Sequence, residues 1–346
     1  MDKNLFFQKV RGVAIIAVIL GHALDTEIKA NYSIIILLRQ FIDFAIATFI
    51  FLSGYFSKVS ALDEKGASLK FIVGKLSRIV LPYLFWSTIA VVFIDKFYGF
   101  NLRKIIVNLI LGQTVYPYYF IVILAQLFVI TPIIAKLLKN KTTRILLFLI
   151  TPISLIIYYS IVFSSGKYIR FPLYAIPFVM WLGFYCYGIL MRNNKNVEKN
   201  ICKNIKINVA LCIVFFAASI MEGFILYDKF DSIDFAVSTV RASSFLFVFF
   251  LINIFIWMKS QPRYNKKIIL VSIGDYSFGI YLIHAFVLNA VKGITAQLTG
   301  QKPFPMHIMF FNAFCTLVIC YALIWIVIWI SRRLKIDKYT RLILGF

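Results

Sequence analysis

The sequence predicts an all-α, polytopic integral membrane protein, a helical bundle of about ten transmembrane helices. Of its 346 residues, 61% are apolar and only 15% are charged, and the mean hydropathy is +0.87. A soluble protein cannot bury that much apolar surface in one core. The apolar runs are continuous rather than alternating, which favours helices over a closed barrel. We therefore expect a single transmembrane domain over residues 1–346.

Long apolar runs define the individual spans. A helix needs roughly 20 apolar residues to cross the hydrocarbon core of a bilayer. Gly274 and Asp275 interrupt the ninth such run, and the run at 105–111 is too short to cross, which predicts an interfacial or re-entrant helix. The predicted spans lie at 8–25, 33–57, 72–97, 117–138, 144–163, 171–191, 207–227, 236–258, 268–291 and 306–331.

The distribution of basic residues predicts the orientation. The chain carries 37 Lys and Arg residues and a net charge of +23. They lie in short clusters between apolar runs, a layout that argues against nucleic-acid binding. With the N-terminus inside, most of them fall in inner segments, as the positive-inside rule requires, and the acidic loop with Asp228, Asp231 and Asp234 falls outside. An even number of spans then places both termini in the cytoplasm.

Arg11 and His22 are the strongest pair of candidate functional residues, because ionisable groups inside a bilayer are costly. Eleven residues make about three helical turns, so both side chains share one helix face, about 16 Å apart along the axis. Arg11 could hold an anion at the cytoplasmic edge while the neutral imidazole of His22 acts as a general base toward a hydroxyl that attacks a thioester. Alternatively, Arg11 is an ordinary inner-surface cation and His22 makes a buried hydrogen bond.

Lys75 and Arg78 form a second basic cluster at the start of the third predicted span. Their i, i+3 spacing places both on the same helix face. Beside Arg11 they could complete a phosphate clamp. Taken alone, they fit ordinary inner-surface charge better.

We single out five further ionisable residues within predicted spans. Arg39 and Asp43, at i and i+4, are expected to form a structural pair. Glu222 and Arg241 lie toward the outer ends of the seventh and eighth spans, where they could pair with each other or face a polar substrate. His284 is either a packing residue or part of the site. We count Glu222, Arg241 and His284 as candidate substrate-binding residues.

The sequence predicts no metal site and no nucleotide P-loop. Its three histidines are scattered, and no His-Glu-x-x-His motif is present. The five cysteines have no spacing typical of a metal knuckle or a disulfide framework. No Gly-x-Ser-x-Gly motif indicates a serine hydrolase.

Four motifs, in order along most of the chain, resemble those of the acyltransferase 3 family of membrane O-acyltransferases. The family opens with an Arg, ten residues and a His, has a Phe-x-Leu-Ser-Gly-Tyr stretch in its second span and a basic pair before Pro-Tyr in its third, and ends with a Ser-x-Gly-Ile-Tyr-Leu-x-His motif. Here these motifs correspond to Arg11 and His22; Phe49-Ile-Phe-Leu-Ser-Gly-Tyr55; Lys75, Arg78, Pro82 and Tyr83; and Ser277 to His284.

The resemblance implies that an acyl group, usually acetyl, moves from cytoplasmic acyl-CoA (acetyl-CoA) to a sugar hydroxyl of a cell-surface polysaccharide or lipid-linked glycan. It implies His22 and Arg11 as catalytic residues, and Arg11, Lys75 and Arg78 as contacts for the CoA phosphates. It also implies a multi-pass protein in the lipids of the bacterial cytoplasmic (inner) membrane. Departures from the family include Gln8, where members often have Asp.

Two other function classes stay open. A polysaccharide exporter or flippase subunit without acyl transfer would also need a polar path through apolar helices, but it predicts no acyl-CoA binding and no dependence on His22. An ion-coupled transporter that uses Arg39, Asp43 and Glu222 gains less support, because no internal repeat is apparent.

Overall fold

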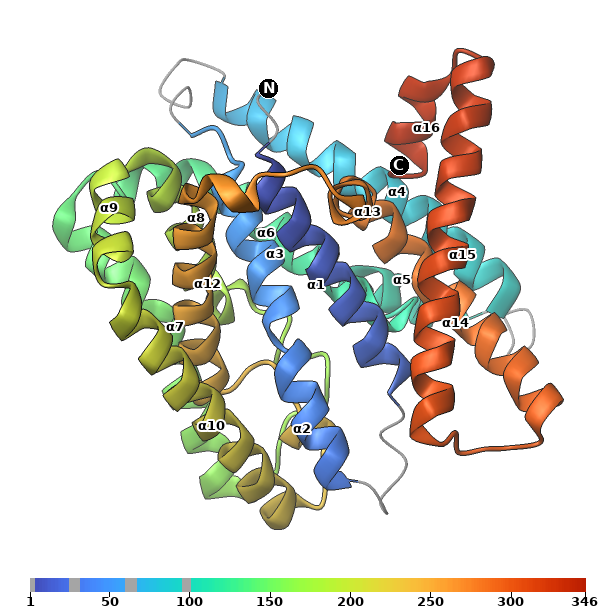
Figure 1. Cartoon of the computed structure of the whole chain (residues 1–346), viewed down its shortest axis with the longest axis horizontal. Helices are drawn as coiled ribbons and strands as arrows, with labels where there is room; N and C mark the ends of the chain where they lie inside the picture. The colour runs from blue at the N-terminus through green and yellow to red at the C-terminus, as the bar shows by residue number, and fades with distance from the viewer. Residues whose placement is uncertain (1–3, 25–31, 60–66, 95–100) are drawn as a thin grey trace.

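The computed structural model describes residues 4–24, 32–59, 67–94 and 101–346 and confirms a polytopic helical bundle (Figure 1). Residues 25 and 95–97 of two predicted spans lie outside the described residues. Within those residues, nine helical spans are long and apolar enough to cross a membrane. They are α1 (Leu5–Ala23), α2 (Tyr32–Ile42) with α3 (Phe44–Tyr55), α4 (Ala67–Ile94), α6 (Tyr119–Leu137), α7 (Lys141–Ser165), α10 (Ile205–Phe230), α12 (Ala242–Ser260), α14 (Ser277–Thr299) and α15 (Met306–Arg333).

Helix α1 lies in the middle of the bundle, with α3 on one side and α13 (Ile269–Asp275), α14 and α15 on the other (Figure 1). Its side chains Phe7, Ala14 and Ile15 are fully buried. Both chain ends lie at the same end of the bundle, which we call the terminal end (Figure 1). That arrangement agrees with an even number of crossings.

The sixth crossing differs from the predicted continuous helix at 171–191, and that prediction is wrong. The chain is irregular from 166 to 181, apart from the single turn η4 (Phe178–Met180), before α8 (Leu182–Asn193) begins. The Tyr168 hydroxyl donates to Ser232, beyond the end of α10, at 3.1 Å. Glu198 in α9 (Lys195–Lys203) pairs with Lys259 at the end of α12, at 2.9 Å. The segment between these two contacts therefore traverses the bundle.

Prolines and buried polar partners explain this irregular crossing. Pro172 and Pro177 lack the N–H that a continuous helix requires. Within the membrane, such backbone is tolerated only where protein groups bind its carbonyls. The Trp181 indole donates to the carbonyl of Ala175 at 2.7 Å, and the Gln126 amide donates to that of Ile176 at 3.1 Å. The crossing is therefore built into the core.

Close helix contacts at glycine fix the elements around α1. A Cβ atom at Gly54 of α3 would overlap the carbonyl oxygen of Tyr185 in α8, and one at Gly274 of α13 would overlap the carbonyl oxygen of Gln8 in α1. Small residues allow such close backbone approach in membranes. The contact at Gly274 brings the neighbouring Asp275 toward the part of α1 that carries Arg11.

The predicted interruption of the ninth span is confirmed, because α13 ends at Asp275 and α14 begins at Ser277. The run at 105–111 forms part of α5 (Leu102–Leu111), a ten-residue helix too short to cross. The remaining short elements are η3 (Tyr116–Tyr118), α11 (Ile233–Ala236), η5 (Pro262–Tyr264) and α16 (Asp337–Ile343).

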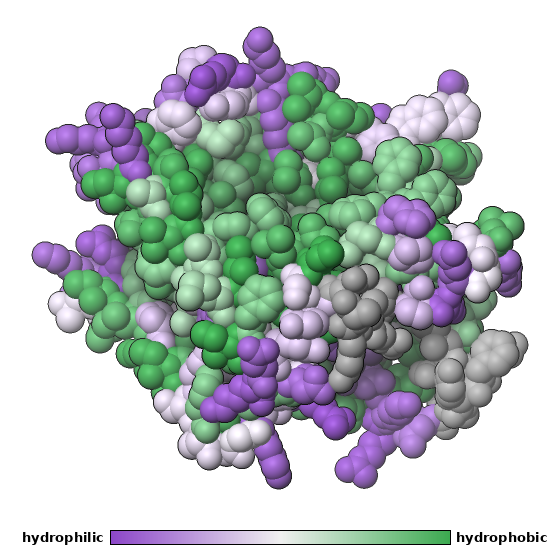
Figure 2. All heavy atoms as spheres, turned by 60° about the horizontal axis from the view of Figure 1, so that its bottom comes forward, coloured by the Kyte–Doolittle hydropathy of each residue, from purple (hydrophilic) through white to green (hydrophobic). Residues whose placement is uncertain are grey.

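Large apolar side chains cover the outside of the bundle. Ile156, Ile213 and Phe314 are about two-thirds exposed. Figure 2 shows hydrophobic surface over much of one face, with hydrophilic side chains gathered along its upper and lower margins. A surface of this kind is suited to lipid.

Candidate active site

One cavity of about 330 Å³ joins four of the candidate residues, those predicted to be catalytic or to bind the acyl donor. Arg11 and His22 both line it, with Val18 between them on the same stripe of α1. Lys75 and Arg78 of α4 line it as well. The helical spacing of Arg11 and His22 therefore places both side chains on one face, as the sequence predicted, and that face borders an internal space.

The part of the cavity nearer the terminal end is cationic. Lys75 and Arg78 lie there with Arg11, and Asp275 is the carboxylate beside them. The Arg11 guanidinium carbon lies 4.8 Å from the ring centroid of Phe56. The Lys75 ammonium lies 5.3 Å from the ring of Phe128 and 5.7 Å from that of Phe71. Cation–π contacts of this kind hold a cation without neutralising its charge, so the cluster can bind an anion.

His22 lies at the far end of α1. Its ring is 5.4 Å from the ring of Tyr116, edge to face, and 5.4 Å from that of His284. Two cations contact the backbone here: Arg39 donates to the carbonyl of Gly21 at 2.6 Å, and Lys292 donates to that of His22 at 3.2 Å. No described residue forms a hydrogen bond to the imidazole of His22, so the ring is available to a ligand in the cavity.

His284 stands next to His22 in α14 but is fully buried, and it is not among the described residues that line the cavity. Its Nδ1 lies 2.7 Å from the carbonyl oxygen of Tyr281. A carbonyl only accepts, so Nδ1 carries the proton. Within the described part of the chain, its Nε2 has no partner. A direct role in substrate binding stays a prediction, whereas a contact with His22 is observed.

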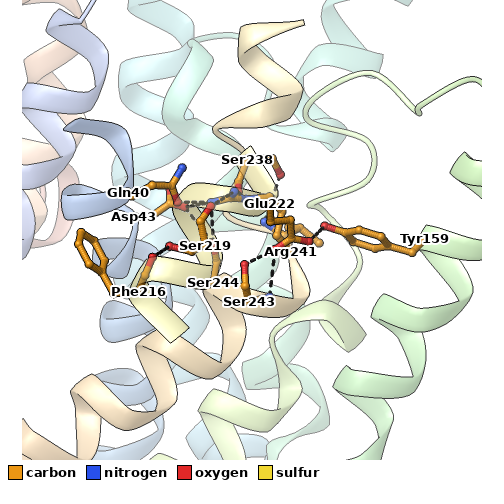
Figure 3. Close-up of polar contacts among 11 residues, drawn as sticks. Gln40, Asp43, Tyr159, Phe216, Ser219, Glu222, Ser238, Arg241, Ser243 and Ser244 are labelled. Atoms are coloured by element: carbon orange, nitrogen blue, oxygen red, sulfur yellow. Dashed lines mark hydrogen bonds and ion pairs between the residues drawn. The ribbon is translucent and has the colours of Figure 1, made fainter. Parts of the chain in front are cut away.

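Arg241 forms the centre of a buried polar cluster (Figure 3). Its guanidinium is fully buried and bonds to the carbonyls of Ser238 and Ser219 and to the side chains of Gln40, Asp43 and Ser244. The Asp43 carboxylate lies 3.1 Å away and lines the cavity. The expected pair of Arg39 with Asp43 is therefore not formed, because Arg241, just before α12, supplies a closer guanidinium.

Glu222 belongs to a neighbouring cluster on α10 (Figure 3). Its carboxylate accepts from the hydroxyls of Tyr159 and Ser243 and, at 3.1 Å, from the backbone N–H of Ser243. None of these contacts joins Glu222 to Arg241, the pair that the sequence analysis considered. Neither Glu222 nor Arg241 is among the described cavity-lining residues, so their substrate-binding roles stay predictions.

Several lining residues were not singled out from the sequence. Tyr116 in η3, Phe171 and Tyr174 in the irregular crossing, and Asp234 and Thr239 around α11 all border the cavity. They lie in short or non-helical elements, where helical periodicity carries no information. The aromatic run around Tyr116 and the acidic loop around Asp234 were the available signals.

The fold and this site define a multi-pass membrane protein with an internal cavity that is lined by a cluster of cations at one end and by an imidazole at the other. The chain matches the family described as acyltransferase domain over residues 4–338. It therefore belongs to the acyltransferase 3 family, which the four sequence motifs predicted. Membership implies an acyl donor as co-substrate.

Two relatives carry names that point to different functions. The chain is 23% identical over 337 residues to a Bacillus subtilis protein provisionally named a membrane-bound acyltransferase, YfiQ, covering 91% of this chain and 88% of the relative. It is 25% identical over 271 residues to a Staphylococcus aureus protein provisionally named a poly-beta-1,6-N-acetyl-D-glucosamine export protein, covering 75% and 73%. No solved structure matches the chain significantly.

Proposed function

We propose that this protein is a membrane O-acyltransferase that moves an acyl group, acetyl in the simplest case, from cytoplasmic acyl-CoA to a sugar hydroxyl of a cell-surface polysaccharide or lipid-linked glycan. The observation that carries the proposal is the shared cavity: Arg11, Lys75, Arg78 and His22 all line it. Family membership supports acyl transfer in general, and the geometry supports this assignment of roles.

The donor would bind through its phosphates. Arg11, Lys75 and Arg78 present cationic donors suited to phosphate oxygens. About three helical turns, or about 16 Å, separate Arg11 from His22. A donor held by its phosphates at the cationic end would therefore need a long, flexible arm to bring its thioester to the imidazole, and acyl-CoA has such an arm.

His22 would act as the general base. Its imidazole takes the proton of the sugar hydroxyl as the oxygen attacks the thioester carbonyl. The tetrahedral intermediate then collapses, the carbon–sulfur bond breaks, and the imidazolium returns its proton to the leaving thiolate. The imidazole lines the cavity, so a hydroxyl bound there can reach it.

The test compares two histidines. We expect His22→Ala to abolish transfer of acetyl from acetyl-CoA to envelope glycans, while CoA still raises the thermal stability of the purified protein. The matched control is His307→Ala, because His307 is exposed and is not among the cavity-lining residues described. Transfer at the wild-type rate by His22→Ala would contradict the mechanism.

A second candidate function is polysaccharide export without acyl transfer, which the name of the Staphylococcus aureus relatives favours. Export predicts that glycan still reaches the surface in His22→Ala cells and that CoA does not stabilise the protein. Acyl transfer predicts the loss of O-acyl esters together with stabilisation by CoA.

The proposed location is the bacterial cytoplasmic membrane, with both termini in the cytoplasm. The common position of the two chain ends supports placing both termini on the same side of the membrane (Figure 1), and the positive-inside rule favours the cytoplasm as that side. A reporter that fluoresces only in the cytoplasm, fused after Phe346, tests the orientation. A fusion protein that inserts into the membrane at normal levels but does not fluoresce would contradict a cytoplasmic C-terminus.

A further inference from the structure

The part of the cavity beyond His22 differs chemically from its cationic end. Arg39, Asp43 and Asp234 line it, with Thr239 and three aromatic rings. Asp234 lies in α11, which follows the end of α10 opposite α9. The cavity therefore has one region suited to an anion and another in which a cation and two carboxylates lie among aromatic side chains.

Asp43 has an unused acceptor in this second region. Its residue is only 6% exposed. The oxygen Oδ2 lies 3.1 Å from Arg241 and 3.3 Å from the Ser244 hydroxyl. No described residue donates to the other oxygen, Oδ1. Because Asp43 borders the cavity, a ligand there can donate a hydrogen bond to this oxygen.

Arg241 holds the Asp43 carboxylate from the side away from the cavity. Its guanidinium is fully buried, with bonds to two other side chains and two carbonyls (Figure 3). Such a network leaves it no freedom to reach a ligand. Arg241 is therefore a positioning residue, which holds Asp43 at the cavity wall and balances its charge.

Tyr116 provides a flat wall next to the imidazole. Its side chain is 58% exposed, its ring lies 5.4 Å from that of His22, and it stacks on Phe171 with centroids 4.9 Å apart. Small-ligand sites typically combine aromatic walls with a few placed polar groups. A sugar ring needs both, because its C–H faces are apolar and its hydroxyls donate and accept.

We propose that Tyr116, Arg39, Asp43 and Asp234 form an acceptor subsite for one uncharged sugar unit of a glycan. The sugar ring lies against Tyr116, one hydroxyl donates to Asp43, a second donates to Asp234, and Arg39 donates to another oxygen, so that the hydroxyl to be acylated reaches His22. Arg241 pairs with Asp43, and the lining residues Arg39 and Asp234 carry one charge of each sign, a balance that suits a neutral sugar. The inference rests on the proposed function and names its acceptor class and residues.

The experiment uses the purified full-length protein with acetyl-CoA and, as the acceptor probe, a pentasaccharide of β-1,6-linked N-acetylglucosamine. Mass spectrometry follows acetyl transfer as the pentasaccharide concentration rises. We expect Asp43→Asn and Asp234→Asn each to raise the KM for the pentasaccharide at least about tenfold, the effect of losing one charge-assisted hydrogen bond. Stabilisation by CoA should stay at the wild-type level.

Two further variants keep the test decisive. Asp43→Asn leaves Arg241 unpaired and can fail to fold, so Tyr116→Ala, at an exposed ring, is measured beside it. The matched control is Asp228→Asn, because Asp228 is an exposed carboxylate in the last turn of α10, six residues before Asp234, and is not among the described lining residues. Its KM should equal that of the wild type.

The possible failures are distinguishable. Unchanged KM values in Asp234→Asn and Tyr116→Ala would overturn the subsite, as would an equal rise in Asp228→Asn. A wild-type protein that CoA stabilises but that transfers no acetyl to the pentasaccharide would overturn the acceptor class. A wild-type protein that neither binds CoA nor transfers acetyl would contradict the proposed function itself.

Discussion

Removal of the Arg241 guanidinium tests how the buried polar cluster contributes to stability. In Arg241→Met the side chain keeps much of its volume, but Asp43 becomes a buried carboxylate without its cation, and the carbonyls of Ser219 and Ser238 lose a donor. Breaking one partner of a buried ion pair costs about 3–5 kcal/mol. We therefore expect the free energy of unfolding to fall by about that amount.

The assay is thermal unfolding in detergent, followed with a thiol-reactive dye. Cys186, Cys212 and Cys320 are buried and react only after the bundle opens. The expected loss corresponds to a decrease of roughly 5–10 °C in the apparent midpoint. Arg170→Met is the control, since Arg170 is exposed and its replacement should change stability by less than about 0.5 kcal/mol.

A double variant separates lost charge pairing from lost packing. Asp43→Leu combined with Arg241→Met removes both charges, and apolar replacement of a buried pair is often neutral. We expect the double variant to be at least as stable as Arg241→Met. Two results would refute the assignment of Arg241 as the partner of Asp43. One is a double variant whose loss of stability equals the sum of the losses in Asp43→Leu and Arg241→Met. The other is an Arg241→Met variant whose melting midpoint equals that of the wild type.

Three further outcomes follow from the same contacts. Gly188→Ala places a Cβ against the carbonyl oxygen of Phe51 and should sharply reduce the yield of folded protein. Gly293→Ala, with open space around it, should leave that yield unchanged. Equal yields of the two variants would contradict the close α3–α8 contact. Lys75→Ala and Arg78→Ala should each weaken CoA binding about tenfold, as measured by calorimetry. Lys70→Ala, at an exposed position outside the described cavity lining, should bind CoA as the wild type does. Glu222→Gln should lower the melting midpoint through its bonds to Tyr159 and Ser243; an unchanged midpoint would show that these bonds add nothing.

Local spacing explains what the sequence could predict. Arg11 and His22 lie on one helix, so the period of 3.6 residues fixes their common face without knowledge of any neighbour. The same holds for Lys75 and Arg78. Most of the spans could likewise be located from apolar length alone, because lipid imposes that length on every crossing helix.

Contacts between distant segments explain what it could not. Arg39 and Asp43 have ideal helical spacing for a pair, but Asp43 bonds instead to Arg241, which is 198 residues away in the chain. No local pattern encodes that choice. The crossing at 171–191 has the composition of a helix, and Pro172 and Pro177 were the visible signals against one. Phe171, at the start of that irregular crossing, supplies part of the aromatic wall.

The most direct test is a structure of the full-length protein in lipid nanodiscs with a non-hydrolysable acetyl-CoA analogue. We expect its phosphates within hydrogen-bonding distance of Arg11, Lys75 and Arg78, and its acetyl carbonyl carbon beside the imidazole of His22. An analogue bound outside the cavity, or one whose acetyl group points away from His22, would contradict a single path from cation cluster to imidazole.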